Sequence, residues 1–179
     1  MHLAKPDDNH EPVAAQDWVS PLVARFEGPL ILYAQRLLGE LGRARDVVQE
    51  TFLRLCRTPR GDVAGHEAAW LYTVCRRAAL DVKRKERRMT LLNDQTASAF
   101  ASTAPDPAHV IEQSDSAAEV LRMLTHLPEN QREAILLKFG HNLSYKEIAQ
   151  VTGHTVSNVG FLIHTGIKTL RTRLTGAPV

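Results

Sequence analysis

The last third of the chain carries side chains of the types that read DNA bases and hold DNA phosphates. Asn amides pair with adenine edges, Lys and Arg bind phosphates, and an apolar ring can touch the methyl group of thymine. The candidate DNA contacts are Ser144, Tyr145, Thr155, Ser157, Asn158, Phe161, His164, Lys168 and Arg171. To read a duplex together, these side chains must be presented by an element that fits a DNA groove.

The segment 143–174 has the parts of a helix-turn-helix, which lays its second helix in the major groove. Ser144 is a good N-cap, and Glu147 three residues later completes a capping box. Gly153 can take the left-handed conformation that ends a helix tightly, and Thr155 or Ser157 can cap the next helix. The second helix has an apolar stripe formed by Val159, Leu162, Ile163, Ile167 and Leu170.

A supporting helix is expected to begin at Leu127-Pro128, with Ile135, Leu136 and Phe139 on its inner face. Any compact helical bundle can show such a pattern, and many repressors and response-regulator output domains share the motif. The helix-turn-helix therefore predicts DNA binding without naming the class of DNA-binding protein.

A second group of candidate DNA contacts lies in a basic stretch between residues 76 and 88. Its cations are Arg76, Arg77, Lys83, Arg84, Lys85, Arg87 and Arg88, whereas 89–121 contains no Lys or Arg. Since net charge is only +2, this is a local basic patch on a chain of balanced charge. Phosphate binding by such a patch is driven largely by counterion release. Trp70 and Tyr72 precede it, and their rings would serve either as core residues or as stacking platforms for unpaired bases.

The sequence contains no motif that indicates catalysis. There is no nucleophile–base set, no phosphate-cradling glycine loop and no metal-binding cluster, so we expect no enzyme, metal or cofactor. Cys56 and Cys75 form no CxxC pair and are predicted to be two buried small side chains. The first residues lack an apolar signal region, and no run approaches membrane-spanning length. We expect a soluble cytoplasmic protein with no membrane insertion.

Helical periodicity dominates the chain, and the fold class expected is all-α, with two small helical domains joined by a flexible linker. Apolar residues recur at helical spacing over 18–26 and 30–41, which predicts two helices with Gly42 as a stop, and again over 47–55, which predicts a third. Residues 58–65 read as a loop, and a further helix is expected over 66–88. The predicted organisation is a disordered N-terminus at 1–15, a first domain at 16–89, a linker at 90–113 and a second domain at 114–175.

Four motifs, in order, resemble the extracytoplasmic-function (ECF) subfamily of bacterial RNA polymerase sigma factors. RDVVQETFLRL (45–55) resembles the conserved second region, and AWLYTVCRRAALD (69–81) resembles the helix of this subfamily that opens the DNA strands. LPENQRE (127–133) and LSYKEIA (143–149) resemble the fourth region. The resemblance covers about 18–88 and 115–174.

The resemblance implies binding to core RNA polymerase, through its β′ and β subunits, to promoter DNA and to an anti-sigma factor. It implies that Asp46, Gln49, Glu50 and Arg54 dock on a β′ coiled coil. The promoter −10 element would be melted and read near 58–67 and 76–81, by Trp70, Tyr72, Arg76, Arg77, Lys83, Arg84, Arg87 and Arg88. The −35 element would be read by the candidates of the helix-turn-helix, with the protein associated with the nucleoid when bound to polymerase.

This chain departs from the subfamily pattern in three places. Arg43 and Arg45 flank Asp46 where acidic residues are usual, and phosphorylation of Thr51 is one hypothesis for a compensating charge. Arg77 stands where Asn is frequent. The segment Gly160-Phe161-Leu162 lacks the usual Lys or Arg, which predicts weak, hydrophobically assisted −35 binding.

Two other function classes compete with an alternative sigma factor. A stand-alone helix-turn-helix regulator would bind a palindromic site as a dimer without polymerase. An enzyme with a DNA-binding tail finds no residue set to support it.

Overall fold

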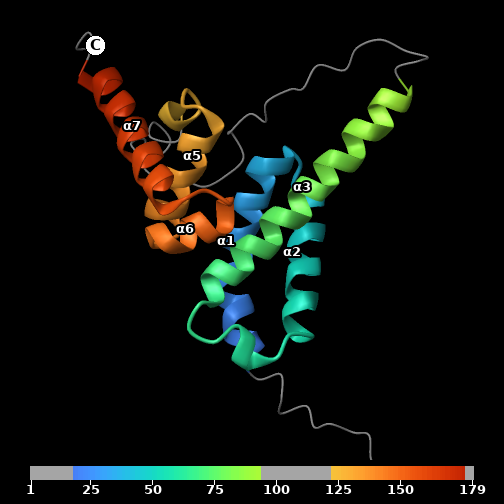
Figure 1. Cartoon of the computed structure of the whole chain (residues 1–179). Coiled ribbons are helices and arrows are strands. Elements are labelled where there is room, and N and C mark those ends of the chain that lie inside the picture. Colours follow the sequence, from blue (N-terminus) through green and yellow to red (C-terminus); the bar gives the residue numbers. More distant parts are fainter. Residues whose placement is uncertain (1–17, 94–121, 176–179) are drawn as a thin grey trace, which may run out of the picture.

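The computed structural model describes residues 18–93 and 122–175, with side chains described over 18–90 and 122–174. All regular structure among these residues is helical, as the sequence predicts. Two groups of helices pack against each other (Figure 1). We call α1–α3 the N-terminal bundle and residues 122–175 the C-terminal bundle. The predicted N-terminal segment 1–15 and most of the predicted linker, 94–113, lie outside the described residues.

The first helix, α1, is continuous from Val19 to Leu38, so the prediction of two helices over 18–41 is wrong. Pro29 lies inside it, where the ring removes one backbone donor but leaves the apolar stripe unbroken. Phe26, Leu30, Tyr33 and Leu37 recur at helical spacing and are buried. Burial of this stripe keeps the helix intact across the proline.

The stop between the first two helices is Gly39, and not Gly42 as predicted. Gly39 has φ 80°, and its N–H donates to the carbonyl of Gln35 at 2.7 Å. Because side chains are disfavoured at this φ, glycine suits the position. Gly42 instead lies in the first turn of α2, which runs from Leu41 to Cys56.

The third helix of this bundle is the longest. A 3₁₀ turn, η2, spans Arg60–Asp62 in the predicted loop, and α3 then runs from Glu67 to Asn93. It packs on α1 and α2 through Leu71, Cys75 and Ala79, which are fully buried. Its last turns extend beyond the bundle (Figure 1), so the first four residues of the predicted linker are helical.

The C-terminal bundle contains the predicted helix-turn-helix. Helix α5 spans Glu129–Ile135, α6 spans Tyr145–Thr152 and α7 spans Val156–Thr175, with residues 122–124 also helical. Ile148, Val159 and Ile163 are buried between them. Gly166 of α7 lies so close to α5 that an added Cβ would stand 2.6 Å from Cδ1 of Ile135. The two helices therefore approach closely at this glycine.

Phe139 was predicted to be an inner residue, and this is wrong. Residues Leu136–Gly140 form a π-helical turn, η4, in which the N–H of His141 donates to the carbonyl of Leu136 at 3.2 Å. The wider turn changes the direction of the side chains that follow it. Leu137 is buried as a result, whereas Phe139 is 64% exposed.

Within the residues that the structure describes, we find no helix long and apolar enough to cross a membrane.

Candidate nucleic-acid interface

The turn of the helix-turn-helix is fixed by local hydrogen bonds that the sequence predicts. The Glu147 N–H donates to Oγ of Ser144 at 3.3 Å, and the Ser144 N–H donates to the Glu147 carboxylate at 2.7 Å. These bonds lower the pKa of Glu147, with the Ser144 side chain the largest cause. Gly153 ends α6 with φ 77°. The capping box and the glycine together set the direction in which α7 leaves.

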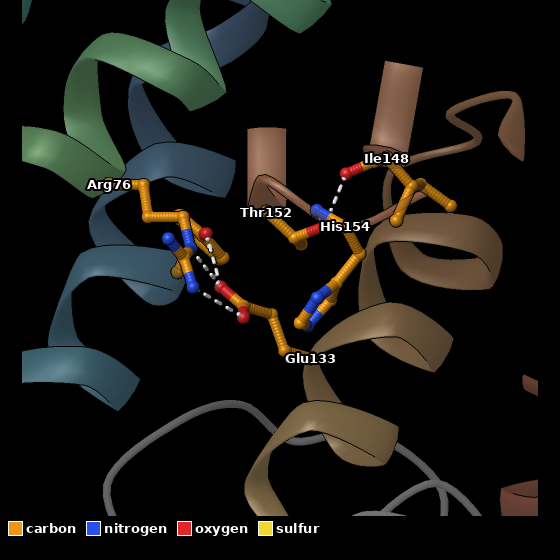
Figure 2. A network of polar contacts seen from close by, with 6 residues as sticks. Arg76, Glu133, Ile148, Thr152 and His154 are labelled. Carbon is orange, nitrogen blue, oxygen red and sulfur yellow. Dashed lines mark hydrogen bonds and ion pairs between the residues drawn. The ribbon is translucent and has the colours of Figure 1, made fainter. Parts of the chain in front are cut away.

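Of the two predicted N-caps of α7, Thr155 makes the capping hydrogen bond, and Ser157 does not serve as the cap. The Asn158 N–H donates to Oγ1 of Thr155 at 3.2 Å. Behind the turn, the buried Thr152 donates its hydroxyl to the carbonyl of Ile148 at 2.7 Å and accepts the His154 N–H at 3.4 Å (Figure 2). One hydroxyl thus satisfies backbone groups on both sides of the turn.

Helix α7 presents a continuous exposed stripe opposite its buried face. Ser157, Phe161, His164 and Lys168 are exposed and recur at spacings of four, three and four. Arg171 continues the stripe three residues further on, and Thr155 is exposed just before the helix begins. Asn158 is half-buried. The structure therefore gathers most of the predicted −35 residues on one side of one helix.

Tyr145 links the two helices of the motif. Its ring lies against α7, where a Cβ at Gly160 would stand 3.6 Å from the ring edge. Nζ of Lys138 lies 5.6 Å from the ring centroid, within the range of a cation–π contact. No local sequence pattern indicates this contact, which places a cation beside the exposed face that contains Ser144 and Tyr145.

The predicted −10 residues, all on α3, separate into two groups. Arg77, Lys83, Arg84, Arg87 and Arg88 are exposed. Arg84 is paired with Asp81 at 2.6 Å, an exposed ion pair of small energetic value. The other group, Trp70, Tyr72 and Arg76, faces the protein: Trp70 is half-buried, Tyr72 is 1% exposed and Arg76 is half-buried.

On α2 the predicted docking residues Asp46, Gln49, Glu50 and Arg54 are all exposed. Glu50 accepts a hydrogen bond from Nε of Arg54 at 2.9 Å, one helical turn away. Arg43 is paired with Glu40 at 2.7 Å and also with Glu86 of α3. Two carboxylates thus balance the charge of Arg43, which lies beside the predicted docking residues.

Thr51 does not share the exposed face of the predicted docking residues. Its side chain is fully buried, and its hydroxyl donates to the carbonyl of Val47 at 2.8 Å. The hypothesis that phosphorylated Thr51 supplies a compensating charge is therefore wrong, because a kinase cannot reach this hydroxyl in the folded helix. The cysteine prediction is half right: Cys75 is buried, but Cys56, at the end of α2, is exposed.

Arg76 makes the main polar contact between the two bundles. It donates Nε and Nη2 to the carboxylate of Glu133 on α5, at 2.9 and 3.2 Å (Figure 2). Tyr33 donates its hydroxyl to the same carboxylate at 2.7 Å. Burial, followed by the charge of Glu133, raises the pKa of Tyr33 well above its usual range. Burial disfavours the charged form of Arg76 and by itself lowers the pKa. The hydrogen bonds and the charge of Glu133 outweigh this effect, so the pKa of Arg76 is raised.

Aromatic rings extend this contact. Tyr33 and Tyr72 meet edge to face with centroids 5.2 Å apart, and the ring of His141 lies 4.7 Å from that of Tyr72. Burial, followed by the charge of Arg36, lowers the pKa of His141 to about 4. The buried Nε2 of His141 has no hydrogen-bond partner among the described residues, which fits a neutral imidazole. We call Tyr33, Tyr72, Arg76, Glu133 and His141 the inter-bundle cluster.

Comparison with known protein families agrees with this arrangement. Residues 22–89 match Sigma-70 region 2, and residues 117–170 match Sigma-70 region 4. The first match covers most of the N-terminal bundle, including the basic stretch of α3, and the second covers most of the helix-turn-helix. Both regions thus coincide with the groups of candidate residues.

Comparison with individual proteins indicates the subfamily of sigma factor. The chain is 32% identical to the ECF RNA polymerase sigma factor SigL of Mycobacterium tuberculosis over 79% of this chain and 80% of that protein. It is 28% identical to SigE of Mycolicibacterium smegmatis over 92% of this chain, but spans only 64% of that longer relative.

The fold has a counterpart among solved structures. The sigma factor RpoE from Bartonella quintana, solved in complex with the anti-sigma factor NepR, superimposes with a TM-score of 0.64 at 21% identity. The likeness covers 91% of this chain and 99% of that one. From the two matched regions, their order and the identity to SigL, we conclude that the chain belongs to the ECF family of RNA polymerase sigma factors.

Proposed function

We propose that the chain binds core RNA polymerase, through its β′ and β subunits, and directs transcription initiation at a subset of promoters. The observation that carries this proposal is the combination of an exposed polar face on α2 with a capped helix-turn-helix, within two matched sigma regions. In this role the protein recognises the promoter, and the polymerase catalyses the formation of bonds. It works in the cytoplasm and is associated with the nucleoid when bound to polymerase.

Docking is assigned to Asp46, Gln49, Glu50 and Arg54 of α2. Glu50 and Arg54 hold one another at 2.9 Å, which limits the freedom of both side chains before a partner arrives. Carboxylate and amide groups suit a basic, polar partner helix, and charges at the rim of an interface mainly set specificity and association rate. The balancing of Arg43 by Glu40 and Glu86 supports a docking face that is less cationic than the sequence alone suggests.

Promoter reading is divided between the bundles. The exposed cations of α3 are assigned to phosphates at the −10 element, with Trp70 and Tyr72 near the unpaired bases. The exposed stripe of α7 is assigned to the −35 element, with Ser144 and Tyr145 at the adjoining end of α6. Phe161 is 65% exposed at the centre of this stripe, which supports an apolar contact with a thymine methyl group.

A transcription assay with purified core polymerase tests the proposal. The full chain should co-purify with core enzyme and give run-off transcripts from its own promoters. Glu50→Arg should reduce both by about tenfold, because it places a cation on the docking face. Glu27→Arg, an equal charge change at an exposed site on α1, is the matched control and should have no effect.

The competing function predicts a different result. A stand-alone regulator would bind a palindromic duplex tightly without polymerase and would be indifferent to Glu50→Arg. That outcome would overturn the sigma-factor assignment.

An anti-sigma factor is a further proposed partner. The Bartonella quintana sigma factor of the same fold was solved with one, NepR. Such a partner would compete for the docking face or for the DNA-reading residues, and co-purification from cells with the tagged chain would identify it.

A further inference from the structure

Glu133 has an unusual position for a charged side chain. It is 7% exposed, although carboxylates are rarely so buried unless they are paired. Every hydrogen bond described for its carboxylate comes from the other bundle: one from Tyr33 of α1 and two from Arg76 of α3. The partners of Glu133 are therefore available only while the two bundles are packed together.

The same packing covers two residues that are assigned to promoter DNA. The ring of His141 lies across Tyr72 at 4.7 Å, and Tyr72 is 1% exposed. Both donors that Arg76 directs at Glu133 belong to the group that would otherwise bind a phosphate. In the packed state neither residue can meet DNA, although the neighbouring cations of α3 are exposed.

We propose that this packing is an autoinhibitory contact, in which Glu133 holds the C-terminal bundle over Tyr72 and Arg76 until the bundles separate. Only the identity of the masked ligand, promoter DNA, rests on the proposed function. The contact needs no second protein, since all its groups belong to this chain. A DNA phosphate offers Arg76 the same paired oxygens as the Glu133 carboxylate, so DNA and the C-terminal bundle compete for one guanidinium.

Removing the charge of Glu133 should open the contact selectively. When the bundles separate, water solvates the Glu133 carboxylate. The ion pair with Arg76 therefore stabilises the packed state only by the difference between its attraction and the cost of desolvation. Glu133→Gln, however, leaves Arg76 facing a neutral amide in the packed state and costs nothing in the open one. The ratio of open to packed molecules should rise by about tenfold or more, as expected for charged hydrogen bonds.

Energy transfer between two dyes on the free full-length chain measures this ratio. One dye is attached to Cys56, which is exposed on α2, and the other to a cysteine introduced by Arg173→Cys at an exposed position on α7. Cys75 is buried with its thiol pKa raised to about 12 by that burial, so it should not compete for the dyes.

Wild type should show mainly one population of transfer efficiency, and Glu133→Gln should show a second population of different efficiency. Tyr33→Phe, which removes one donor from the opposite bundle, should shift the ratio in the same direction but less. Glu129→Gln, an equal charge change at an exposed site on the same helix, is the matched control and should leave the transfer unchanged. Far-UV circular dichroism should show equal helix content in all four proteins.

Binding of a fluorescein-labelled single-stranded oligonucleotide tests the masking itself. Glu133→Gln should bind about tenfold more tightly than Glu129→Gln, which has the same net charge. Unchanged energy transfer in both Glu133→Gln and Tyr33→Phe would overturn the contact. Altered transfer with equal DNA affinity would overturn the autoinhibition. Neither readout requires polymerase, so failure of the proposed function in transcription would be seen separately.

Discussion

Acidification should destabilise the folded protein through His141. The imidazole faces the rings of Tyr33 and Tyr72 and the charge of Arg36, and burial holds its pKa at about 4, against about 6.5 in an unfolded chain. At neutral pH the ring is mostly neutral in both states. Between these two pKa values the unfolded state binds the proton and the folded state does not, so stability falls as pH falls.

The size of this effect follows from the two pKa values. At about pH 5.5 the unfolded imidazole is roughly nine-tenths protonated and the folded one is almost neutral, so the folded state loses about 1 kcal/mol relative to neutral pH. The loss grows to about 2 kcal/mol near pH 4.5, where carboxylates also begin to titrate. The milder pH therefore isolates the histidine better.

Urea unfolding of wild type and His141→Phe at the two pH values provides the assay. Phenylalanine keeps a ring against Tyr72 but cannot titrate, so this variant should lack the loss of about 1 kcal/mol. Other histidines are present in both proteins, and their effects cancel in the difference. An NMR titration of the His141 ring would give its pKa directly. Equal pH dependence in the two proteins, or a ring that titrates near its usual pKa, would refute the reasoning.

Three further predictions concern single positions. Gly153→Ala should lower the free energy of unfolding by about 1 kcal/mol, because φ is 77° there, and an unchanged urea midpoint would contradict this. Gly160→Lys should strengthen binding to the cognate −35 duplex and raise the salt slope by about 1, because its Cβ has room beside Tyr145. Gly160→Ala is its uncharged control, and equal affinity of the two variants in a salt titration would count against the idea. Thr51→Glu should destabilise the protein by several kcal/mol because it buries an unpaired carboxylate, whereas Thr51→Val should fold; a stable Thr51→Glu protein in thermal melts would show that the site is more open than described.

Features that depend on a few neighbouring residues could be predicted from the sequence. The capping box of Ser144 and Glu147 and the left-handed Gly153 are local, and both are confirmed. The candidate stripe of α7 follows from helical spacing alone. These elements position most of the −35 candidates, which is why their places on the helix-turn-helix could be predicted before the fold was known.

Features set by distant contacts could not be predicted in the same way. Continuity of α1 through Pro29 depends on burial against two other helices, and the exposure of Phe139 depends on one π-helical turn. The pairing of Arg76 with Glu133 joins residues 57 positions apart, and no local sequence pattern predicts it. In the sequence Arg76 looks like one more member of the basic patch, and only the structure shows that it contacts the other bundle.

The caps of the helix-turn-helix have a consequence for how hydroxyl groups meet DNA. Ser144 and Thr155 each accept a backbone N–H with the side-chain oxygen, so the hydroxyl proton of each remains to be donated elsewhere. Because the helix start holds the oxygen in place, each exposed hydroxyl is a preorganised donor that loses little rotational entropy when a phosphate arrives. The bonds that begin the two helices would therefore also prepare both residues for the proposed contact with DNA.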